Sequence, residues 1–568
     1  MTSSVSSTAS LLSSSTSTSS TTSSGSTSST SDIDWDGLIE EAVQAKLSKA
    51  DSIDLKITEN EAKSAAFQSL SDLLADVQTA AQALRAPSGS SQASTDVFNA
   101  RTAYLTANGD VDASSSVSAT VESGATMGSY DLAITQLATA HKVTSAGQSS
   151  KTSDLGYDGV ISLGTSTDTM TEIEITSDMT LAEVAEAINA QSDATGVQAS
   201  VLKVSSSSYQ LVLSGTSTGT TIVAEAVSGD DLLTELGITD EAGDFADVLQ
   251  EPQDAIFSID GIAVTRTTND IDDVIEGVTL HLYQVTPDDT SITVEIGTDL
   301  SSVKDAIVAL VDAYNAYRDF AYAEQQLPSD DNADTTVLFG DSTLRTISAA
   351  VTAAISESIG SNTMALLGLS FDSTNNLELD EDTLDDALLS SLDEIQSLLS
   401  FQMESSSASL LLLSRGTEVP NDFTLDIVTD SSGVITSALV GGDSSLFTIS
   451  GTRIIGATGS GYEGFTFVYA GSSSKSVDVS FTTGIAELLY NIADEATDET
   501  SGTLTTIISD IGDTNDDLTD KSDDIRSRAE TYRTNLTNRY ATLQAAISEA
   551  ESMQDYLTTL LDTWNSSS

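Results

Sequence analysis

The sequence predicts an α+β protein with a long helical coiled-coil stem formed by both chain termini, β-rich head domains and one inserted β domain. Residues 518–564 repeat apolar side chains every 3.5 residues without a Gly or Pro, which is typical of the seam of a long helix. Between the termini, apolar and polar residues alternate around turn dipeptides, and this pattern indicates strands. Helical periodicity at both ends and strand periodicity between them therefore define the fold class.

The C-terminal seam extends over about seven unbroken heptads, which exceeds what a surface helix needs and predicts a partner. One row of seam positions comprises Leu518, Ile525, Tyr532, Arg539, Ala546, Met553 and Leu560. The other row comprises Ser522, Ala529, Leu536, Leu543, Ala550, Leu557 and Trp564. We expect Leu536, Leu543, Leu557 and Trp564 to be the main anchors and Arg539 to be the weak point that sets the register.

A second apolar stripe with the same spacing lies near the N-terminus and predicts the other side of the stem. It comprises Phe67, Leu70, Leu74, Val77, Ala81 and Leu84, after a looser stripe through Leu38, Ile39, Ala42, Val43 and Ile53. The polar seam residues Ser522, Arg539, Lys46 and Asn60 should add little stability. We therefore expect the stem helices to be stable only when they pack against neighbouring subunits. A hairpin within one subunit is the alternative, because a heptad pattern does not show how many helices pack together or whether they belong to one chain.

The charge balance excludes several classes of partner. Lys and Arg total 21 against 87 Asp and Glu, a formal net charge of -66. Such a surface repels phosphate and anionic lipid, which argues against nucleic-acid and membrane-surface roles. Because the screening length falls to about 3 Å in molar salt, we hypothesise a high-salt host. Cysteine is absent, so there are no disulfides and no thiolate ligands or nucleophiles.

Composition and periodicity divide the chain into six segments. We expect a disordered Ser/Thr-rich leader over 1–31, N-terminal stem helices over 32–86, a β-rich head of two small modules over 87–298, a helical upper stem over 299–404, an inserted β domain over 405–482, and a C-terminal helix and coiled coil over 483–568. The leader is either a flexible tail or an unfolded signal for an export machine that does not recognise conventional signals.

Turn and cap signals locate individual elements. Thr180 and Glu183 form a capping box that starts a helix. Asp260-Gly261 between two apolar-alternating runs predicts a type I′ hairpin. A loop over 269–273 and a Glu276-Gly277 turn are expected to come next, and then a strand over 278–283. Further on, helices are predicted over 342–358 and 384–401.

Catalytic and metal sites find little support in the sequence. Residues 459–464 fit the string G-x-G-x-x-G, but residues 465–469 have the pattern of a strand, so no helix N-terminus is available for a pyrophosphate. Residues 215–219 fit the nucleophile-elbow string, which is expected by chance in a chain this rich in Ser and Gly. A calcium loop starting at Asp372 lacks the required Gly and Glu. We expect His141 and His281 to lie at strand surfaces.

The run from Ala255 to Leu280 closely resembles the characteristic core of the bacterial flagellar filament cap, or hook-associated protein 2, family. Residues 128–138 resemble that family's first head strand, and residues 180–219 resemble the repeated module of hook-filament proteins. Shorter matches occur at 339–345, 367–380 and 458–464, and the terminal seam also matches. The residues that carry the core motif are Asp260, Gly261, Asn269, Ile271, Gly277, Val278 and Leu280. The long leader and the extreme acidity depart from the family pattern.

The resemblance implies a structural assembly protein without enzymatic activity, cofactor or metal, secreted to the distal tip of the flagellar filament. The implied partners are copies of itself in a closed ring of about five subunits, within a range of four to six. Flagellin, the filament-tip subunits and a flagellar export chaperone are further implied partners, whereas nucleic acid and membrane are not. A surface adhesin that uses the head and the inserted domain, and another axial junction protein, are the alternatives.

Overall fold

The computed structural model describes residues 34–85, 96–168, 170–326, 336–416 and 419–566, so the predicted leader lies outside the described residues. The chain divides into two compact units, one comprising residues 1–68 with 506–568 and the other residues 69–505. Long helices at both ends and β-rich segments between them confirm the predicted fold class. The predicted domain boundaries stay a prediction.

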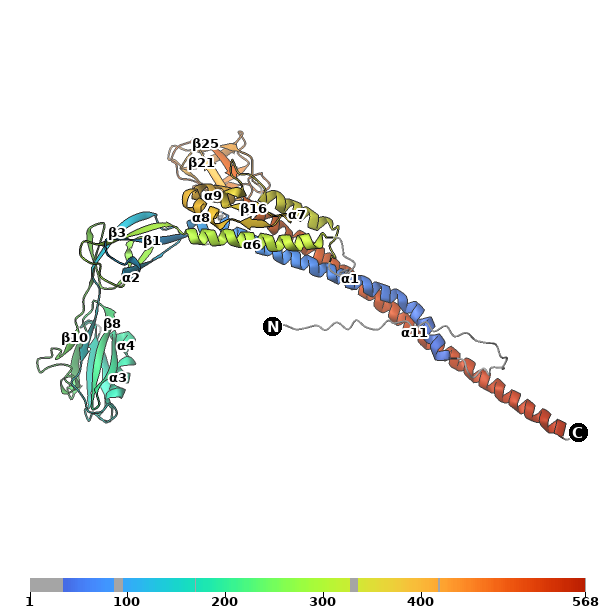
Figure 1. Cartoon of the computed structure of the whole chain (residues 1–568), viewed down its shortest axis with the longest axis horizontal. Coiled ribbons are helices and arrows are strands. Elements are labelled where there is room, and N and C mark those ends of the chain that lie inside the picture. Colours follow the sequence, from blue (N-terminus) through green and yellow to red (C-terminus); the bar gives the residue numbers. More distant parts are fainter. Residues whose placement is uncertain (1–33, 86–95, 169, 327–335, 417–418, 567–568) are drawn as a thin grey trace. The chain divides into compact units, whose positions relative to one another are not determined.

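The first unit contains two long helices that lie side by side (Figure 1). They are the parts of α1 (Trp35–Leu84) and α11 (Thr503–Ser566) that belong to this unit. Asn60 contacts Asn515, and Trp35 contacts Tyr540. The contact nearer the N-terminus of α1 is therefore nearer the C-terminus of α11, so the two helices are antiparallel.

The second unit begins with two antiparallel sheets around one core. The larger sheet has the order β1 (Arg101–Asn108), β15 (Ser291–Thr298), β3 (Gly128–Gln136), β11 (Ala255–Ile259) and β12 (Ile262–Arg266). The smaller has the order β13 (Asp270–Ile275), β14 (Val278–Leu282) and β2 (Val117–Val121), and the short helices η3 (Val97–Asn99) and α2 (Ala113–Ser116) lie nearby in sequence. Inward residues such as Phe257, Leu280 and Val294 form the shared core.

The Asp260-Gly261 turn joins β11 to β12 as predicted. Asp260 has φ 51° and Gly261 has φ 77°, which are the two positive values that a type I′ turn requires. The predicted loop over 269–273 is wrong, because β13 begins at Asp270 and pairs with β14. The charged residues of Asp270–Ile275 hide the alternation of this strand, in which Ile271 and Ile275 are buried.

A module of two sheets and short helices comes after β3 in the chain. One sheet has the order β10 (Val248–Gln250), β4 (Ala140–Thr144), β8 (Ser208–Thr218) and β7 (Val197–Ser205), and the other has the order β6 (Thr171–Ile175), β5 (Gly159–Gly164) and β9 (Val223–Gly229). The helices are α3 (Leu181–Asn189), α4 (Ser192–Thr195) and α5 (Leu232–Glu235). Both halves of the Thr180–Glu183 capping box are present, which confirms that prediction.

The segment after β15 is mainly helical, and it contains two helices where one was predicted over 384–401. The elements are α6 (Leu300–Glu324), α7 (Ser342–Ile355), η4 (Met364–Leu367), β16 (Leu369–Phe371), β17 (Leu377–Leu379), α8 (Glu381–Ser390), α9 (Leu392–Leu399) and α10 (Ile485–Thr497). The single helix predicted over 384–401 is wrong, because Ser391 has φ -143° and interrupts the helical backbone between α8 and α9. No Gly or Pro marks this break.

Two four-stranded sheets fill the segment between α9 and α10. The first sheet has the order β18 (Gln402–Ser405), β25 (Lys475–Thr482), β20 (Phe423–Thr429) and β21 (Ile435–Val440). The second sheet has the order β19 (Leu410–Ser414), β24 (Thr466–Tyr469), β23 (Arg453–Gly456) and β22 (Phe447–Ser450). Their inner faces share one core that includes Leu425, Phe467 and Val477. We call this segment the inserted β segment. Across the described residues, every helix is too short or too polar to span a membrane.

Candidate interaction site along the terminal helix pair

We call the two helical stretches of the first unit, 35–68 and 506–566, the terminal helix pair. Its apolar centre is short. Ile39, Val43 and Ala529 are fully buried against one another, and a rim of partly buried Leu47, Tyr532, Leu536 and Tyr540 surrounds them. The antiparallel pair is therefore held in part within a single chain, as the hairpin alternative proposed.

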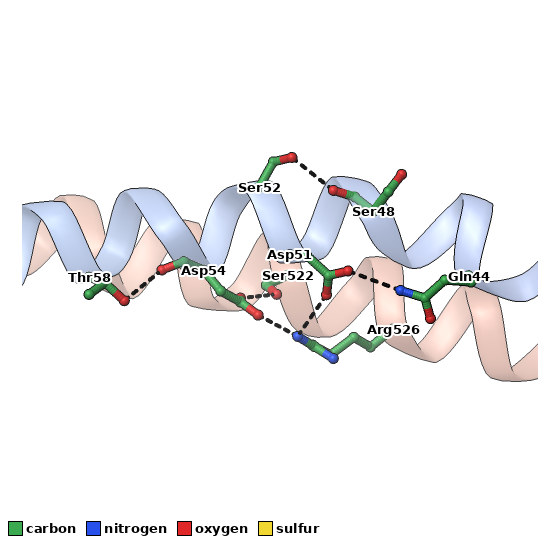
Figure 2. Close-up of polar contacts among 8 residues, drawn as sticks. All are labelled: Gln44, Ser48, Asp51, Ser52, Asp54, Thr58, Ser522 and Arg526. Atoms are coloured by element: carbon green, nitrogen blue, oxygen red, sulfur yellow. Dashed lines mark hydrogen bonds and ion pairs between the residues drawn. The ribbon is translucent and has the colours of Figure 1, made fainter. Parts of the chain in front are cut away.

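A polar layer lies next to this centre and replaces apolar packing (Figure 2). Ser522 is only 3% exposed, and its Oγ donates a hydrogen bond to Asp54 Oδ1 at 2.7 Å. Arg526 pairs with the other oxygen of Asp54 and lies 3.7 Å from Asp51. The Gln44 amide donates to Asp51 at 3.3 Å. Hydrogen bonds from Ser522 and Arg526 hold the pKa of the Asp54 carboxyl below its usual value.

Three of the polar seam residues that were expected to contribute little, Ser522, Asn60 and Lys46, have partners on the other helix. Asn60 donates to Asn515 across the pair at 2.8 Å. Lys46 Nζ lies 4.6 Å from the centre of the Tyr532 ring. Polar contacts of this kind are lost when two helices shift out of register, so they help to fix the alignment of the pair. The structure therefore suggests register determinants other than Arg539, which is exposed.

The predicted seam residues fall into three groups. Phe67, Leu70, Leu74, Val77 and Leu84 of α1 are fully buried. Leu518, Ile525, Tyr532 and Leu536 of α11 are partly buried. Arg539, Leu543, Met553, Leu557, Leu560 and Trp564 are exposed, and Trp564 is 74% exposed. In the described residues, the apolar cluster of the helix pair includes α11 residues up to Tyr540, whose ring lies 5.0 Å from the Trp35 ring and is tilted by 32°.

The exposed end of α11, residues 541–564, has a composition suited to association. Besides the predicted seam residues, Tyr556 and Leu561 are also exposed. Its charged residues are Glu549, Glu551, Asp555 and Asp562, with no Lys or Arg. These charges lie mainly away from the seam rows in the heptad, so the apolar stripe runs largely uninterrupted. We call this stretch the distal stripe.

The family-motif residues are placed in the head, where they have structural contacts. Asn269 pairs with the backbone of Ala138 in both directions, accepting from its N–H at 2.7 Å and donating to its C=O at 2.9 Å. Ile271, Val278 and Leu280 are buried in the core. Gly277 has φ 75°, which the turn between β13 and β14 requires. These residues build the fold around the head rather than an exposed site.

A buried charge cluster at the base of the inserted β segment escaped the sequence-based interpretation. Glu487 of α10 lies 2.7 Å from Arg85 Nε and 2.7 Å from Arg415 Nη2, and all three side chains are almost fully buried. The Arg85 guanidinium stacks on the Tyr490 ring at 3.6 Å. Burial lowers the pKa of Arg415 to about 10. The three residues are far apart in sequence, so no local pattern could have revealed them.

The residues considered above for catalysis or metal binding do not come together in one site within the described part of the chain. Strand β24 comes directly after the G-x-G-x-x-G string, and β8 runs through most of 215–219. The prediction for His141 is wrong: it is buried, its Nδ1 accepts from the Ile222 N–H at 2.9 Å, and burial lowers its pKa. His281 on β14 lies 2.6 Å from Asp270. The described residues contain no cluster of His, Asp and Glu that could hold a metal ion.

Family profiles match most of the chain. The profile described as flagellar hook-associated protein 2 C-terminus matches residues 252–552, more than half of the chain. The profile for the N-terminus of the same family matches residues 31–141. The flagellin hook IN motif matches residues 160–217, which confirms the predicted resemblance to a hook-filament module.

Individual relatives agree with the profiles. The B-type flagellar hook-associated protein 2 of Pseudomonas aeruginosa is 27% identical, over 53% of this chain and 66% of its own length. The flagellar hook-associated protein 2 of Salmonella typhimurium is 32% identical, over 36% of this chain and 46% of its own length. The match thus spans about half to two thirds of these relatives.

Among solved structures, the D1-D2-D3 domains of the flagellar cap protein FliD from Escherichia coli are 27% identical to this chain. The match covers 59% of this chain and 90% of that one, with a TM-score of 0.44. The profile matches give no support to the adhesin or junction-protein alternatives. With more than half of its residues matched by one family profile, the chain belongs to the flagellar hook-associated protein 2 family.

Proposed function

We propose that this chain caps the distal end of a bacterial flagellar filament, promotes the polymerisation of exported flagellin and prevents its loss. The observation that carries the proposal is the family profile match over residues 252–552 and 31–141. The role is structural and needs no catalytic residue or cofactor. The protein is secreted and acts outside the cell at the filament tip.

The proposed partners are copies of the chain, flagellin with the filament-tip subunits, and a flagellar export chaperone. Copies assemble into a closed ring, which is the usual symmetry for identical chains, and the family resemblance implies about five subunits. The exposed seam residues Leu543, Met553, Leu557, Leu560 and Trp564 mediate the contacts between copies. Nucleic acid and membranes are not partners, since the formal net charge of -66 repels both.

The distal stripe supports an association role. Each large apolar side chain buried there would contribute roughly 1.5 to 3 kcal/mol. The large apolar side chains of the stripe, Leu543, Leu557, Leu560, Leu561 and Trp564, are 46% to 74% exposed. In the proposed ring they would pack against another subunit.

The exposed seam residues provide the test of the proposal. Leu536 packs inside the helix pair, whereas Leu543 and Leu557 are exposed. Replacing Leu543 and Leu557 with Asp should abolish ring assembly and filament growth while the head stays folded. The matched control replaces Gln544 and Ser548, which lie off the seam rows, with Asp and adds the same charge.

Ring assembly is measured in molar salt by sedimentation velocity and electron microscopy, and filament growth is measured on cells that lack the native cap protein. Loss of rings and filaments in the Leu543→Asp, Leu557→Asp variant, with normal behaviour of the control, supports the proposal. Normal rings and normal filaments in both variants would contradict it.

A further inference from the structure

Two outer strands of the inserted β segment flank one groove. Strand β18 pairs with β25 and strand β19 pairs with β24, and on its other side each is unpaired among the described strands. A groove of about 580 Å³ lies beside both strands. Its lining includes Met403 and Ser405 of β18 and all five residues of β19. The groove therefore lies between the open edges of two different sheets.

Strand β19 lacks most of the features that usually protect an open edge. Its residues 410–413 are four consecutive leucines, so apolar side chains project from both of its faces. Leu411 is 60% exposed. Natural proteins protect such edges with Lys, Pro, inward charges or bulges, and β19 has only a register shift near Leu412. Leu410 is buried and its N–H donates to the Ser407 C=O, so the part of the edge from Leu411 onward remains available to a partner.

We propose that this groove binds an extended strand of another polypeptide that has not yet folded. Both strands beside the groove are outer strands of their sheets, so an extended strand can add to either of them. Its main chain pairs with β18 or β19, and its apolar side chains contact the leucines. The occupant is thus an extended segment rather than a folded surface.

The inference rests on the proposed function for the identity of that polypeptide. In the proposed function the chain meets segments of flagellin that has just been exported and has not yet joined the filament. Strand addition suits such a segment, because main-chain hydrogen bonds supply affinity without requiring one particular sequence. The site would hold an apolar segment until the segment joins its own sheet or helix.

A cross-linking experiment on the assembled full-length protein tests the proposal. The chain has no cysteine, so Leu411→Cys introduces a single thiol for a photoreactive label. Val434→Cys, also in the inserted β segment and 56% exposed, is the matched control. The probes are overlapping flagellin peptides of about fifteen residues, which are too short to fold alone, and folded flagellin monomer. We expect apolar peptides to cross-link at least tenfold more at position 411 than at position 434, and more than folded flagellin does.

A second variant tests whether peptide binding requires the open edge of β19. Leu411→Lys places a charge on the exposed edge and should weaken peptide binding, measured by fluorescence anisotropy, at least tenfold, whereas Val434→Lys should leave it unchanged. Circular dichroism checks that both variants fold. Equal cross-linking at the two positions, equal cross-linking of folded flagellin, or unchanged binding by Leu411→Lys would overturn the inference.

Filament growth by the unmodified protein separates this inference from the proposed function. If filaments grow normally and no peptide cross-links at position 411, the groove proposal is wrong and the cap function stands. If the unmodified protein supports no filament growth, the cap function is wrong, whatever the cross-linking shows.

Discussion

Ser522 Oγ donates a hydrogen bond to Asp54 across 2.7 Å, although the two residues are 468 positions apart in the chain. The Asp54 carboxylate also pairs with Arg526, so a buried hydroxyl and a cation share one acceptor. This contact joins the two helices at one register. It replaces the apolar pair that a regular seam would place there.

The Asp54 contact predicts a pH-dependent contribution to stability. The pKa of this carboxyl is lowered in the folded protein, mainly by the bond from Ser522 and then by Arg526. Its contribution is therefore fully present above the ordinary carboxyl pKa of 3.8 and is lost as the pH falls through the lower folded value. Asp54→Asn should lower the melting temperature of the helix pair at pH 7, and the difference from the unmodified protein should shrink below pH 3.8. A difference that is constant with pH would contradict this account.

The buried cluster around Glu487 predicts a large loss of stability. Glu487→Gln leaves the Arg85 and Arg415 guanidinium groups buried without a countercharge. Removing one partner from a buried ion pair typically costs about 3 to 5 kcal/mol. Denaturant unfolding in molar salt measures this free energy. Glu495→Gln, at an exposed site on the same helix, should change it by less than about 0.5 kcal/mol.

Substitutions of two glycines should lower the stability of the folded protein for different physical reasons. Gly261 has φ 77° and open space around its Cα, so Gly261→Ala carries only a backbone cost of roughly 1 to 2 kcal/mol. At Gly456 an added Cβ would lie 1.6 Å from the Tyr462 carbonyl oxygen. Gly456→Ala therefore forces the backbone apart and should destabilise the protein more than Gly261→Ala. Thermal unfolding of both variants checks the order, and the reverse order would show that the loop at Tyr462 adjusts freely.

The acidic composition predicts salt dependence. At a formal charge of -66, self-repulsion should decrease strongly as the screening length shortens from about 10 Å at 0.1 M to about 3 Å at 1 M salt. The melting temperature and the fraction of assembled protein should both rise with KCl concentration. Stable, assembled protein in dilute buffer would contradict the hypothesis of a high-salt host.

Local patterns in the sequence predict the elements whose determinants are local. The Asp260-Gly261 turn, the Thr180 capping box and the buried stripe from Leu70 to Leu84 each depend on residues a few positions apart. The break at Ser391 is not predicted, because it carries no Gly or Pro signal. The burial of His141 is not predicted either, because nothing local indicates the buried Ile222 N–H that it accepts from.

The candidate site was predictable only in part. Heptad spacing identifies which side chains of α11 face a partner, but it does not say where the partner helix begins. The pairing of Ser522 with Asp54 and the contact of Tyr540 with Trp35 both depend on how α1 is aligned with α11. The Arg85–Glu487–Arg415 cluster likewise depends on three distant segments. Such relationships become visible only in three dimensions.

The antiparallel pairing of α1 with α11 also dictates an order of events. Asn60 and Asn515 are separated by 455 positions, so the segment between them has to be synthesised before the two residues can meet. Contacts between such distant residues form slowly, because the entropy of closing the loop opposes them until the intervening segments are compact. We therefore expect the helix pair to form late in folding, after the β-rich portions are complete.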